Sequence, residues 1–346
     1  MKKFFFVFLI LFVPIPVIAN ASSYIVMDQN SNQILYGSNY NDKSLIASIT
    51  KIMTAIIVIE NSEVDRTITV NDEVLKAYGS AVYLEVGEKI KIKDLLYGLM
   101  LRSGNDAAIV LANEVGGSID DFSVLMNNLA KKLKLKNTTF VNPHGLDEES
   151  KNYSTAYDMA VIMSYAMKND IFREITKAKN YTTKSSYKTY NWKNKNKLLF
   201  DYKYTTGGKT GYTELANRTL VTTASKDNMD IVVVTINYPN DFSNHKGYYE
   251  KVFKKYESVK VLDKNVTSFE KNYYIKNDYY ALVKRGEEKN ISVKNKIYNK
   301  PVNLIAGKTE VYNKDQLLYT DNIYKYQRSE ETLSWWQKIV DWFKSW

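Results

Sequence analysis

Residues 52–59 constrain the fold of this chain more than any other stretch, because apolar side chains crowd every side of the helix that they predict. A helix that is apolar all round must be buried in a core. Ser48 and Lys51 stand at the start of this helix, one helical turn apart. The chain therefore has to fold around the helix and to accommodate a lysine at its buried end.

The first 21 residues have the composition of a secretory signal peptide. Two lysines (residues 2–3) precede an apolar run that two prolines interrupt (residues 4–17), and Ala-Asn-Ala at 19–21 is a small-x-small cleavage site. We expect cleavage before Ser22 and export of the mature chain. An uncleaved N-terminal anchor is the alternative, and it also places the folded part outside the cytoplasmic membrane.

The chain contains no cysteine and only two histidines, His144 and His245. An exported fold without disulfides depends on its core, and 45% of the residues are hydrophobic. Thiol nucleophiles and thiolate metal sites are excluded, and neither an H-E-x-x-H spacing nor a G-x-S-x-G elbow is present. The sequence therefore predicts no metal and no cofactor.

The net charge is +10, and the lysines are spread along the chain rather than gathered in one arm. Together with export, this spread argues against a nucleic-acid partner and favours an anionic membrane surface or a cell-wall polymer. The lysine-rich segment 184–197 fits either a contact with such a polymer or an ordinary solvated strand surface.

Two regions with strand patterns flank a helical middle. Residues 23–36 predict a hairpin, residues 46–167 have helical periodicity, and strand patterns return after residue 180. This order predicts an α+β fold in which helices flank an antiparallel sheet and form a helical subdomain. We expect a signal peptide, a catalytic domain, a small β-rich domain and a membrane-anchor helix, with the boundaries 1–21, 22–258, 259–326 and 327–346.

The tail SWWQKIVDWFKSW is strongly amphipathic, with its tryptophans on one side of a helical wheel. A helix of about 14 residues reaches only about 21 Å, which is too short for a hydrocarbon core of about 30 Å. We expect the helix to lie in the membrane interface. Docking of the same helix on the protein's own core is the alternative.

The motif S-x-x-K occurs four times, at Ser48, Ser185, Ser243 and Ser268, so it is a weak signal alone. Only Ser48 stands at the start of a long apolar helix, where the spacing puts it on one face with Lys51. Burial lowers the pKa of a lysine, and a neutral amine can take a proton from a serine. A helix cap at Ser48 with a partly exposed Lys51 explains this motif equally well.

Two further motifs decide between these interpretations. Ser103-Gly104-Asn105 lies between two predicted helices, and Lys209-Thr210-Gly211 lies in a predicted strand. A phosphate loop at either G-K-T fails, because Lys203 and Val302 stand where its first glycine is needed. The order S-x-x-K, S-x-N, K-T-G is the set found in penicillin-recognising serine enzymes.

With these motifs in place, residues 23–255 closely resemble the low-molecular-mass penicillin-binding proteins that are D-alanyl-D-alanine carboxypeptidases. The C-terminal region is similar to that family's β domain and membrane anchor by arrangement. The resemblance is carried by ASITKIMTA, AVYLEVGEKIKIKDLLYGLMLRSGNDAAIVLA, FVNPHGLD, YSTAYDMA and GGKTGYTELA.

The resemblance implies a serine-type DD-peptidase domain of the β-lactamase-like fold that removes the terminal D-alanine from peptidoglycan stem peptides. Ser48 would be the nucleophile that forms the acyl-enzyme, Lys51 the base that activates it, and Ser103 the proton relay to the departing D-alanine. β-Lactams would acylate the same serine.

The resemblance also implies substrate-binding residues. Asn105 would hydrogen-bond the substrate backbone and Lys51. Lys209 and Thr210 would hold the terminal carboxylate, and Gly211 would leave room for the substrate along the strand. The backbone N–H of Tyr212, with that of Ser48, would form the oxyanion hole.

The chain departs from the family pattern in two places. Thr206-Gly207-Gly208 precedes K-T-G where the family has Asp-Gly and a large aliphatic residue, and we expect the glycines to loosen that strand. Asn217-Arg218 stands where a small residue is commoner. A deacylating glutamate of the class A β-lactamase type is missing, so efficient lactam hydrolysis is not expected. A DD-endopeptidase or a wall-binding protein without turnover remains an alternative.

Overall fold

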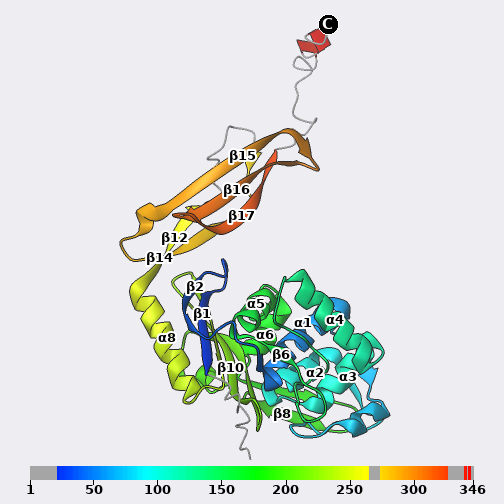
Figure 1. Cartoon of the computed structure of the whole chain (residues 1–346). Helices are drawn as coiled ribbons and strands as arrows, with labels where there is room; N and C mark the ends of the chain where they lie inside the picture. The colour runs from blue at the N-terminus through cyan, green and yellow to red at the C-terminus, as the bar shows by residue number, and fades with distance from the viewer. Residues whose placement is uncertain (1–21, 265–272, 326–338, 341, 344–346) are drawn as a thin grey trace, which may run out of the picture.

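The computed structural model describes residues 22–264, 273–325, 339–340 and 342–343. The predicted signal peptide and most of the predicted membrane-anchor helix lie outside these residues. Within them, no helix has the length and apolar character that crossing a bilayer requires. The described chain forms a large domain of mixed helices and strands, from which α8 leads into an elongated region of strands (Figure 1).

The helices expected between residues 46 and 167 are present, and further helices that were not predicted follow them. The α-helices are α1 (Lys51–Asn61), α2 (Ile92–Tyr97), α3 (Asn105–Gly116), α4 (Ile119–Lys132), α5 (Ala156–Ala166), α6 (Asp170–Lys177), α7 (Leu198–Asp201) and α8 (Asp241–Lys255). The 3₁₀ turns are η1 (Ala47–Thr50) and η2 (Asp72–Lys76), and η3 (Gly98–Arg102) is a π-helical turn.

A five-stranded antiparallel sheet lies at the centre of this domain, in the order β2-β1-β11-β10-β9. Its strands are β1 (Ser23–Asp28), β2 (Ile34–Ser38), β9 (Thr205–Thr213), β10 (Asn217–Lys226) and β11 (Met229–Ile236). The other strands of the domain form two-stranded pairs: β3 (Ser44–Leu45) with β6 (Tyr153–Ser154), β4 (Thr67–Thr69) with β5 (Lys89–Lys91), and β7 (Asn180–Lys184) with β8 (Thr189–Lys193).

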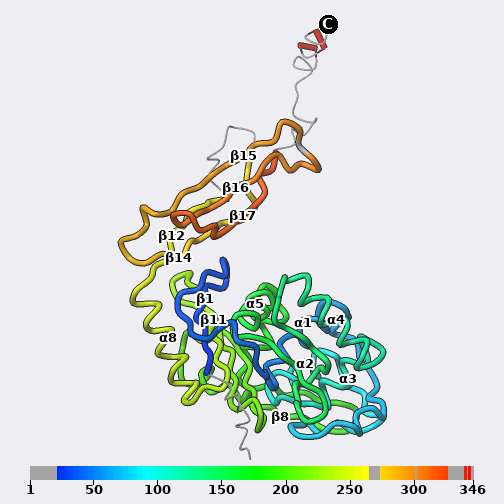
Figure 2. The backbone as a smooth tube through the Cα atoms, in the orientation of Figure 1, coloured from blue at the N-terminus to red at the C-terminus, as the bar shows by residue number. Residues whose placement is uncertain are grey.

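The central sheet is buried on both faces. Ile25 and Met27 on β1 join the main core beneath the helical subdomain, whereas Val26 between them joins the cluster against α8. This alternation follows from the two-residue period of a strand. The tube in Figure 2 shows β1 beside β11, which follows it by some 200 residues in the chain. The α+β prediction and the predicted N-terminal hairpin are confirmed.

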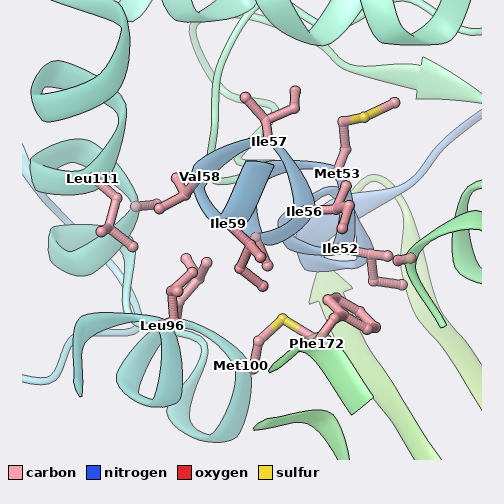
Figure 3. Close-up of a cluster of buried hydrophobic side chains, with 14 of the residues drawn as sticks. Ile52, Met53, Ile56, Ile57, Val58, Ile59, Leu96, Met100, Leu111 and Phe172 are labelled. Atoms are coloured by element: carbon pink, nitrogen blue, oxygen red, sulfur yellow. The ribbon is translucent and has the colours of Figure 1, made fainter. Parts of the chain in front are cut away.

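Helix α1 runs through the middle of the main core, as its sequence predicts. Its side chains from Lys51 to Ile59 are all buried. Figure 3 shows its hydrophobic side chains, from Ile52 to Ile59, surrounded by residues from α2, η3, α3 and α6, namely Leu96, Met100, Leu111 and Phe172. Packing on every side fixes the position of the helix start, where Ser48 and Lys51 lie.

The chain passes from α8 directly into the second region, which consists of strands and one short turn. These elements are β12 (Tyr256–Leu262), β13 (Tyr273–Tyr274), β14 (Tyr279–Lys284), η4 (Glu288–Asn290), β15 (Ile291–Val302), β16 (Ile305–Asn313) and β17 (Gln316–Lys325). β12 pairs with β14, and the other strands form a sheet in the order β13-β17-β16-β15. Its core is small and centres on Tyr279, Val311 and Ile323.

Candidate active site

Ser48 and Lys51 meet at the junction of η1 and α1. The amine of Lys51 donates to Ser48 Oγ at 3.0 Å, to Asn105 Oδ1 at 2.7 Å and to the carbonyl oxygen of His144 at 2.6 Å. Gly145 makes the last contact possible, because a Cβ at this position would lie 2.0 Å from the carbonyl oxygen of Ala47. The loop that carries His144 is thereby pressed against η1.

Lys51 is completely buried and has no carboxylate among its hydrogen-bond partners. Burial is the main cause that lowers its pKa to about 7, and the nearby charge of Lys195 adds to the effect. Removal of an ammonium ion from water disfavours its charged form. The result is an amine that exchanges a proton near neutral pH, at hydrogen-bond distance from a serine hydroxyl.

Ser103 and Asn105 are placed by an unusual turn between η3 and α3. Ser103 ends the π-helical turn η3 with a left-handed backbone, φ +66°. Such a conformation is costly for a residue with a Cβ, and both it and π-turns recur at functional sites. Asn105 is fixed at both ends of its amide, because Nδ2 donates to the carbonyl oxygen of Tyr78 at 2.6 Å while Oδ1 accepts from Lys51.

Lys209 on β9 forms a second serine–lysine pair with Ser103. Its amine donates to Ser103 Oγ at 3.0 Å and to the carbonyl oxygen of Thr210 at 2.7 Å. Burial lowers its pKa well below the usual value, and the charges of Lys51 and Lys195 act in the same direction. Ser103 and Lys209 come from elements that are far apart in the sequence, and the fold brings them beside the pair of Ser48 and Lys51.

Gly211 brings β9 into contact with the start of η1. A Cβ there would lie 2.3 Å from Thr219 Oγ1 and 2.9 Å from the backbone nitrogen of Ser48. No larger residue fits between the strand and the helix start. β9 is also the edge strand of the sheet, and its residues Thr210, Gly211 and Tyr212 line the cleft, where an extended chain could lie beside them.

The glycines before Lys209 do not loosen β9, contrary to expectation. Thr176 on α6 binds both backbone polar groups of Gly208, with its Oγ1 accepting from the nitrogen at 2.9 Å and donating to the oxygen at 3.2 Å. A Cβ on Gly207 would lie 2.4 Å from Thr176 Cγ2. The glycines thus allow α6 to lie directly against the strand and to hold it.

A cleft of about 410 Å³ opens beside these residues. It is lined by the predicted residues Ser48, Ser103, Thr210, Gly211 and Tyr212, while Lys51, Asn105 and Lys209 lie buried next to it. All eight predicted site residues therefore belong to one place. In the described part of the chain, no group of three or more His, Asp or Glu side chains is arranged to hold a metal ion.

Several further residues line the cleft that motif reasoning did not find. They are Ser80, Lys195, Lys197, Arg218, Thr219, Asp241 and Phe242. Arg218 forms a two-pronged ion pair with the buried Asp241, at 3.1 and 2.8 Å. A signal for Arg218 was present in the sequence, because a small residue is commoner in the family where Asn217-Arg218 stands. Lys195 belongs to the lysine-rich segment, and its amine donates to Ser80 Oγ at 3.3 Å.

The arrangement is suited to acyl transfer. It combines a hydroxyl beside an amine whose pKa is lowered to about 7 with a second hydroxyl that accepts a hydrogen bond from a second buried amine. An amide substrate along β9 would have one pair for attack and the other for its leaving group.

Comparisons with known proteins agree with this chemistry. Residues 14–240 match the D-alanyl-D-alanine carboxypeptidase family. The D-alanyl-D-alanine carboxypeptidase DacF of Bacillus subtilis is 31% identical over 314 residues, which cover 88% of this chain and 77% of that protein. A D-alanyl-D-alanine carboxypeptidase of Streptomyces sp. K15 is 36% identical, over 63% of this chain and 80% of its own length. Penicillin binding protein 5 from Haemophilus influenzae superimposes with a TM-score of 0.72 at 25% identity, over 88% of this chain and 96% of that chain.

Proposed function

The chain belongs to the D-alanyl-D-alanine carboxypeptidase family, and we propose that it removes the terminal D-alanine from peptidoglycan stem peptides through an acyl-enzyme on Ser48. The observation that carries the proposal is the hydrogen bond of 3.0 Å between Ser48 Oγ and the buried amine of Lys51. A lysine with a pKa of about 7 can serve as a base at neutral pH, whereas an exposed lysine cannot.

In the acylation step, Lys51 takes the proton of Ser48 while Oγ bonds to the carbonyl carbon between the two D-alanines. The N–H groups of Ser48 and Tyr212 stabilise the oxyanion, and loss of one such donor typically costs about 2.7–4 kcal/mol. The C–N bond then breaks, and Ser103 relays the proton that Lys51 took to the departing amine, which leaves Lys51 neutral again. Lys209, at 3.0 Å from Ser103 Oγ, supports this transfer.

The terminal carboxylate of the substrate is held by Thr210 and Lys209 at the opening of the cleft. Burial has lowered the pKa of Lys209 in the free protein, and an arriving carboxylate restores its charge. Asn105 holds the substrate backbone with the amide that also fixes Lys51. Water then attacks the acyl carbon while Lys51 takes its proton. The C–O bond to Ser48 breaks as Lys51 returns this proton to Ser48 Oγ, which releases the shortened stem peptide and restores the free enzyme.

The proposal includes an exported enzyme on the outer face of the cytoplasmic membrane. The A-N-A site at 19–21 supports cleavage of a signal peptide, and the tryptophan-rich tail after Leu333 supports peripheral anchoring. Deletion from Leu333 onward is expected to move the protein from the membrane fraction to the soluble fraction, as measured by fractionation and blotting. Unchanged membrane association would point to an uncleaved N-terminal segment.

Substrate assays with a matched pair of variants test the reaction. The purified protein is incubated with a pentapeptide stem and with cross-linked muropeptides, and released D-alanine or cleaved cross-links are measured. Ser48→Ala should lower turnover by at least about 10⁴-fold, because no other group can form the acyl-enzyme. Ser243→Ala is the control, since Ser243 belongs to another S-x-x-K motif and lies outside the cleft.

The same variants decide the nucleophile. A labelled penicillin should attach to the wild type and to Ser243→Ala but not to Ser48→Ala, and labelling of Ser48→Ala contradicts the assignment. Cleavage of cross-links alone would identify a DD-endopeptidase. Turnover of neither substrate, with wild type and Ser48→Ala indistinguishable, would identify a wall-binding protein without catalysis.

A further inference from the structure

A tyrosine beside the cleft is held in a conformation that its side chain disfavours. Tyr83 has a left-handed backbone, φ +65°, and its side chain is 77% exposed. For a bulky residue this backbone conformation is strained, and such strain persists only where the surroundings impose it. The residues around Tyr83 therefore stabilise a backbone conformation that leaves its aromatic ring exposed to solvent.

Two buried carboxylates impose this arrangement on the loop that carries Tyr83. Asp106 accepts hydrogen bonds from the backbone nitrogens of Val82 and Leu84, at 3.0 and 3.2 Å. The side chains of Val82 and Leu84 are buried. Further along the loop, Glu88 accepts from the nitrogen of Glu85 at 3.0 Å. The loop is thus fixed on both sides of Tyr83, and the ring of Tyr83 remains exposed to solvent.

The tip of the β7–β8 hairpin extends this exposed surface. Lys188 donates to the carbonyl oxygen of Tyr83 at 2.6 Å and pairs with Glu85 at 2.5 Å. Tyr187, next to Lys188, is 55% exposed, and its hydroxyl would lie 2.8 Å from a Cβ on Gly87. Tyr83 and Tyr187, with Lys188 and Glu85 beside them, form what we call the tyrosine platform.

The loop that carries Tyr83 begins at a residue of the cleft wall. Ser80 lines the cleft, and its carbonyl oxygen accepts from the backbone nitrogen of Asn105 at 2.7 Å. Tyr83 follows three residues later, so the two Cα atoms are at most about 11 Å apart. Four residues of an extended peptide span roughly 14 Å. A stem peptide with its end at Ser48 can therefore carry the group attached to its other end as far as the platform.

We propose that the tyrosine platform binds a sugar ring of the glycan strand that carries the stem peptide. A sugar ring has a face of C–H groups that fits against an aromatic ring and a rim of hydroxyl and acetamido groups that fits the charged groups of Lys188 and Glu85. A preformed, rigid aromatic ring loses little entropy on binding. The inference rests on the proposed function, because the sugar reaches the platform only when its stem peptide occupies the cleft.

The test compares two substrates that differ only in the sugar. The full protein is assayed with a free pentapeptide and with the same pentapeptide joined to its disaccharide, and kcat/KM is measured from released D-alanine. Tyr83→Gly removes the ring and keeps a residue suited to the left-handed backbone, whereas Tyr83→Phe keeps the ring. Tyr187→Ala removes the second ring, and Tyr298→Ala on the separate strand β15 controls for loss of an exposed tyrosine.

We expect the wild type to prefer the disaccharide substrate by about three- to tenfold, the range that one aromatic contact supplies. Tyr83→Gly and Tyr187→Ala should lose this preference and keep their kcat/KM on the free pentapeptide, while Tyr83→Phe and Tyr298→Ala retain the preference. A wild type with equal kcat/KM on the two substrates overturns the inference and leaves the proposed carboxypeptidase activity unaffected. The same result is expected if the platform binds a protein instead of a sugar. An equal loss on both substrates overturns the inference too, because the loop would then act on the cleft. Release from neither substrate contradicts the proposed function itself.

Discussion

The two serine–lysine pairs of the cleft have the same chemistry and the same separation, yet they are built differently. Ser48 and Lys51 come from one helical turn, whereas Ser103 and Lys209 come from a loop and a strand that are 106 residues apart. Both Nζ–Oγ distances are 3.0 Å, and burial lowers the pKa of both lysines. What differs is the set of other partners around each amine.

Both amines are buried, but Lys51 has one more acceptor than Lys209. Besides its serine, Lys51 donates to Asn105 Oδ1 and to the His144 carbonyl oxygen. Among the residues that the structure describes, Lys209 donates to the carbonyl oxygen of Thr210 besides Ser103. Burial favours the neutral form of both amines in the free protein. In the proposed function Lys51 stays a neutral base, whereas Lys209 regains its charge when the carboxylate of the substrate binds.

Replacement of each lysine by methionine should separate these two roles. Lys51→Met is expected to lower kcat by about 10²–10⁴-fold with little change in KM, because it removes a general base. Lys209→Met should raise KM by roughly 10–100-fold, because it removes a charged hydrogen bond to the substrate. It should also lower kcat, because Lys209 supports Ser103, but by less than Lys51→Met does. Steady-state kinetics with the pentapeptide measures both effects.

Thermal unfolding of the two variants serves as the control for this comparison. Methionine fills the volume of a buried lysine without its desolvation cost. Lys51→Met also leaves Asn105 Oδ1 and the His144 carbonyl oxygen without this donor, so we expect a melting temperature lowered by a few degrees in Lys51→Met and by less in Lys209→Met. Two variants that both lose kcat and keep KM would show that Lys209 acts on the reacting atoms rather than on the carboxylate.

The pH dependence of turnover should reveal the amine of Lys51. Its pKa is lowered to about 7, so the amine is protonated and inactive as a base below this value. At saturating substrate, kcat is expected to rise about tenfold per unit between pH 5 and pH 7 and then to level off. KM should rise with pH, because Lys209 needs a proton to hold the carboxylate.

Other groups that titrate near neutral pH can be separated from Lys51. Burial lowers the pKa of His144 and of His245 to about 3, so neither histidine changes charge in this range. Burial raises the pKa of Asp28 to about 6, but Asp28 lies at the end of β1 outside the cleft. The rise of kcat should persist in Asp28→Asn and vanish in Lys51→Met. Persistence in Lys51→Met would assign the base to another group.

The sequence allowed prediction of the parts of the site whose signals are local. Ser48 and Lys51 lie one turn apart where η1 runs into α1, so their mutual position follows from helix geometry. The pairing of Ser103 with Lys209 depends on how η3 meets β9 and was not predicted, although the resemblance to a family assigned both residues to one site. The effect of Gly207 and Gly208 was misjudged, because a glycine signals a close approach without naming the neighbour, which is Thr176.

Helix α8 was absent from the predictions because its buried side is polar in the first half of the helix, although Val252 and Phe253 are buried near its end. Asp241, His245 and Tyr249 occupy positions where aliphatic residues usually mark the inner face of a helix. In the fold their polar atoms are satisfied, with His245 Nδ1 and the Tyr249 hydroxyl each 2.7 Å from Thr222 Oγ1. Long-range hydrogen bonds of this kind leave no periodic trace, and the same holds for Arg218, which pairs with Asp241.

The smallest predicted effect tests how firmly β9 must be held for Lys209 to work. Gly207→Ala places a Cβ 2.4 Å from Thr176 Cγ2, so the strand or α6 must shift. We expect a loss of about 1–3 kcal/mol in the free energy of unfolding. KM should rise several-fold, because Lys209 moves with the strand.

The matched variant Thr176→Ser removes the clashing methyl group and keeps the hydroxyl that binds Gly208. In a double-mutant cycle measured by denaturant unfolding, it should recover a large part of the loss caused by Gly207→Ala. Gly247→Ala on α8 is the control, since a Cβ there meets nothing within 4 Å and alanine favours a helix. Strict additivity of the two substitutions would mean that Thr176 does not hold the strand, and Lys209 would then owe its position to Ser103 and the sheet alone.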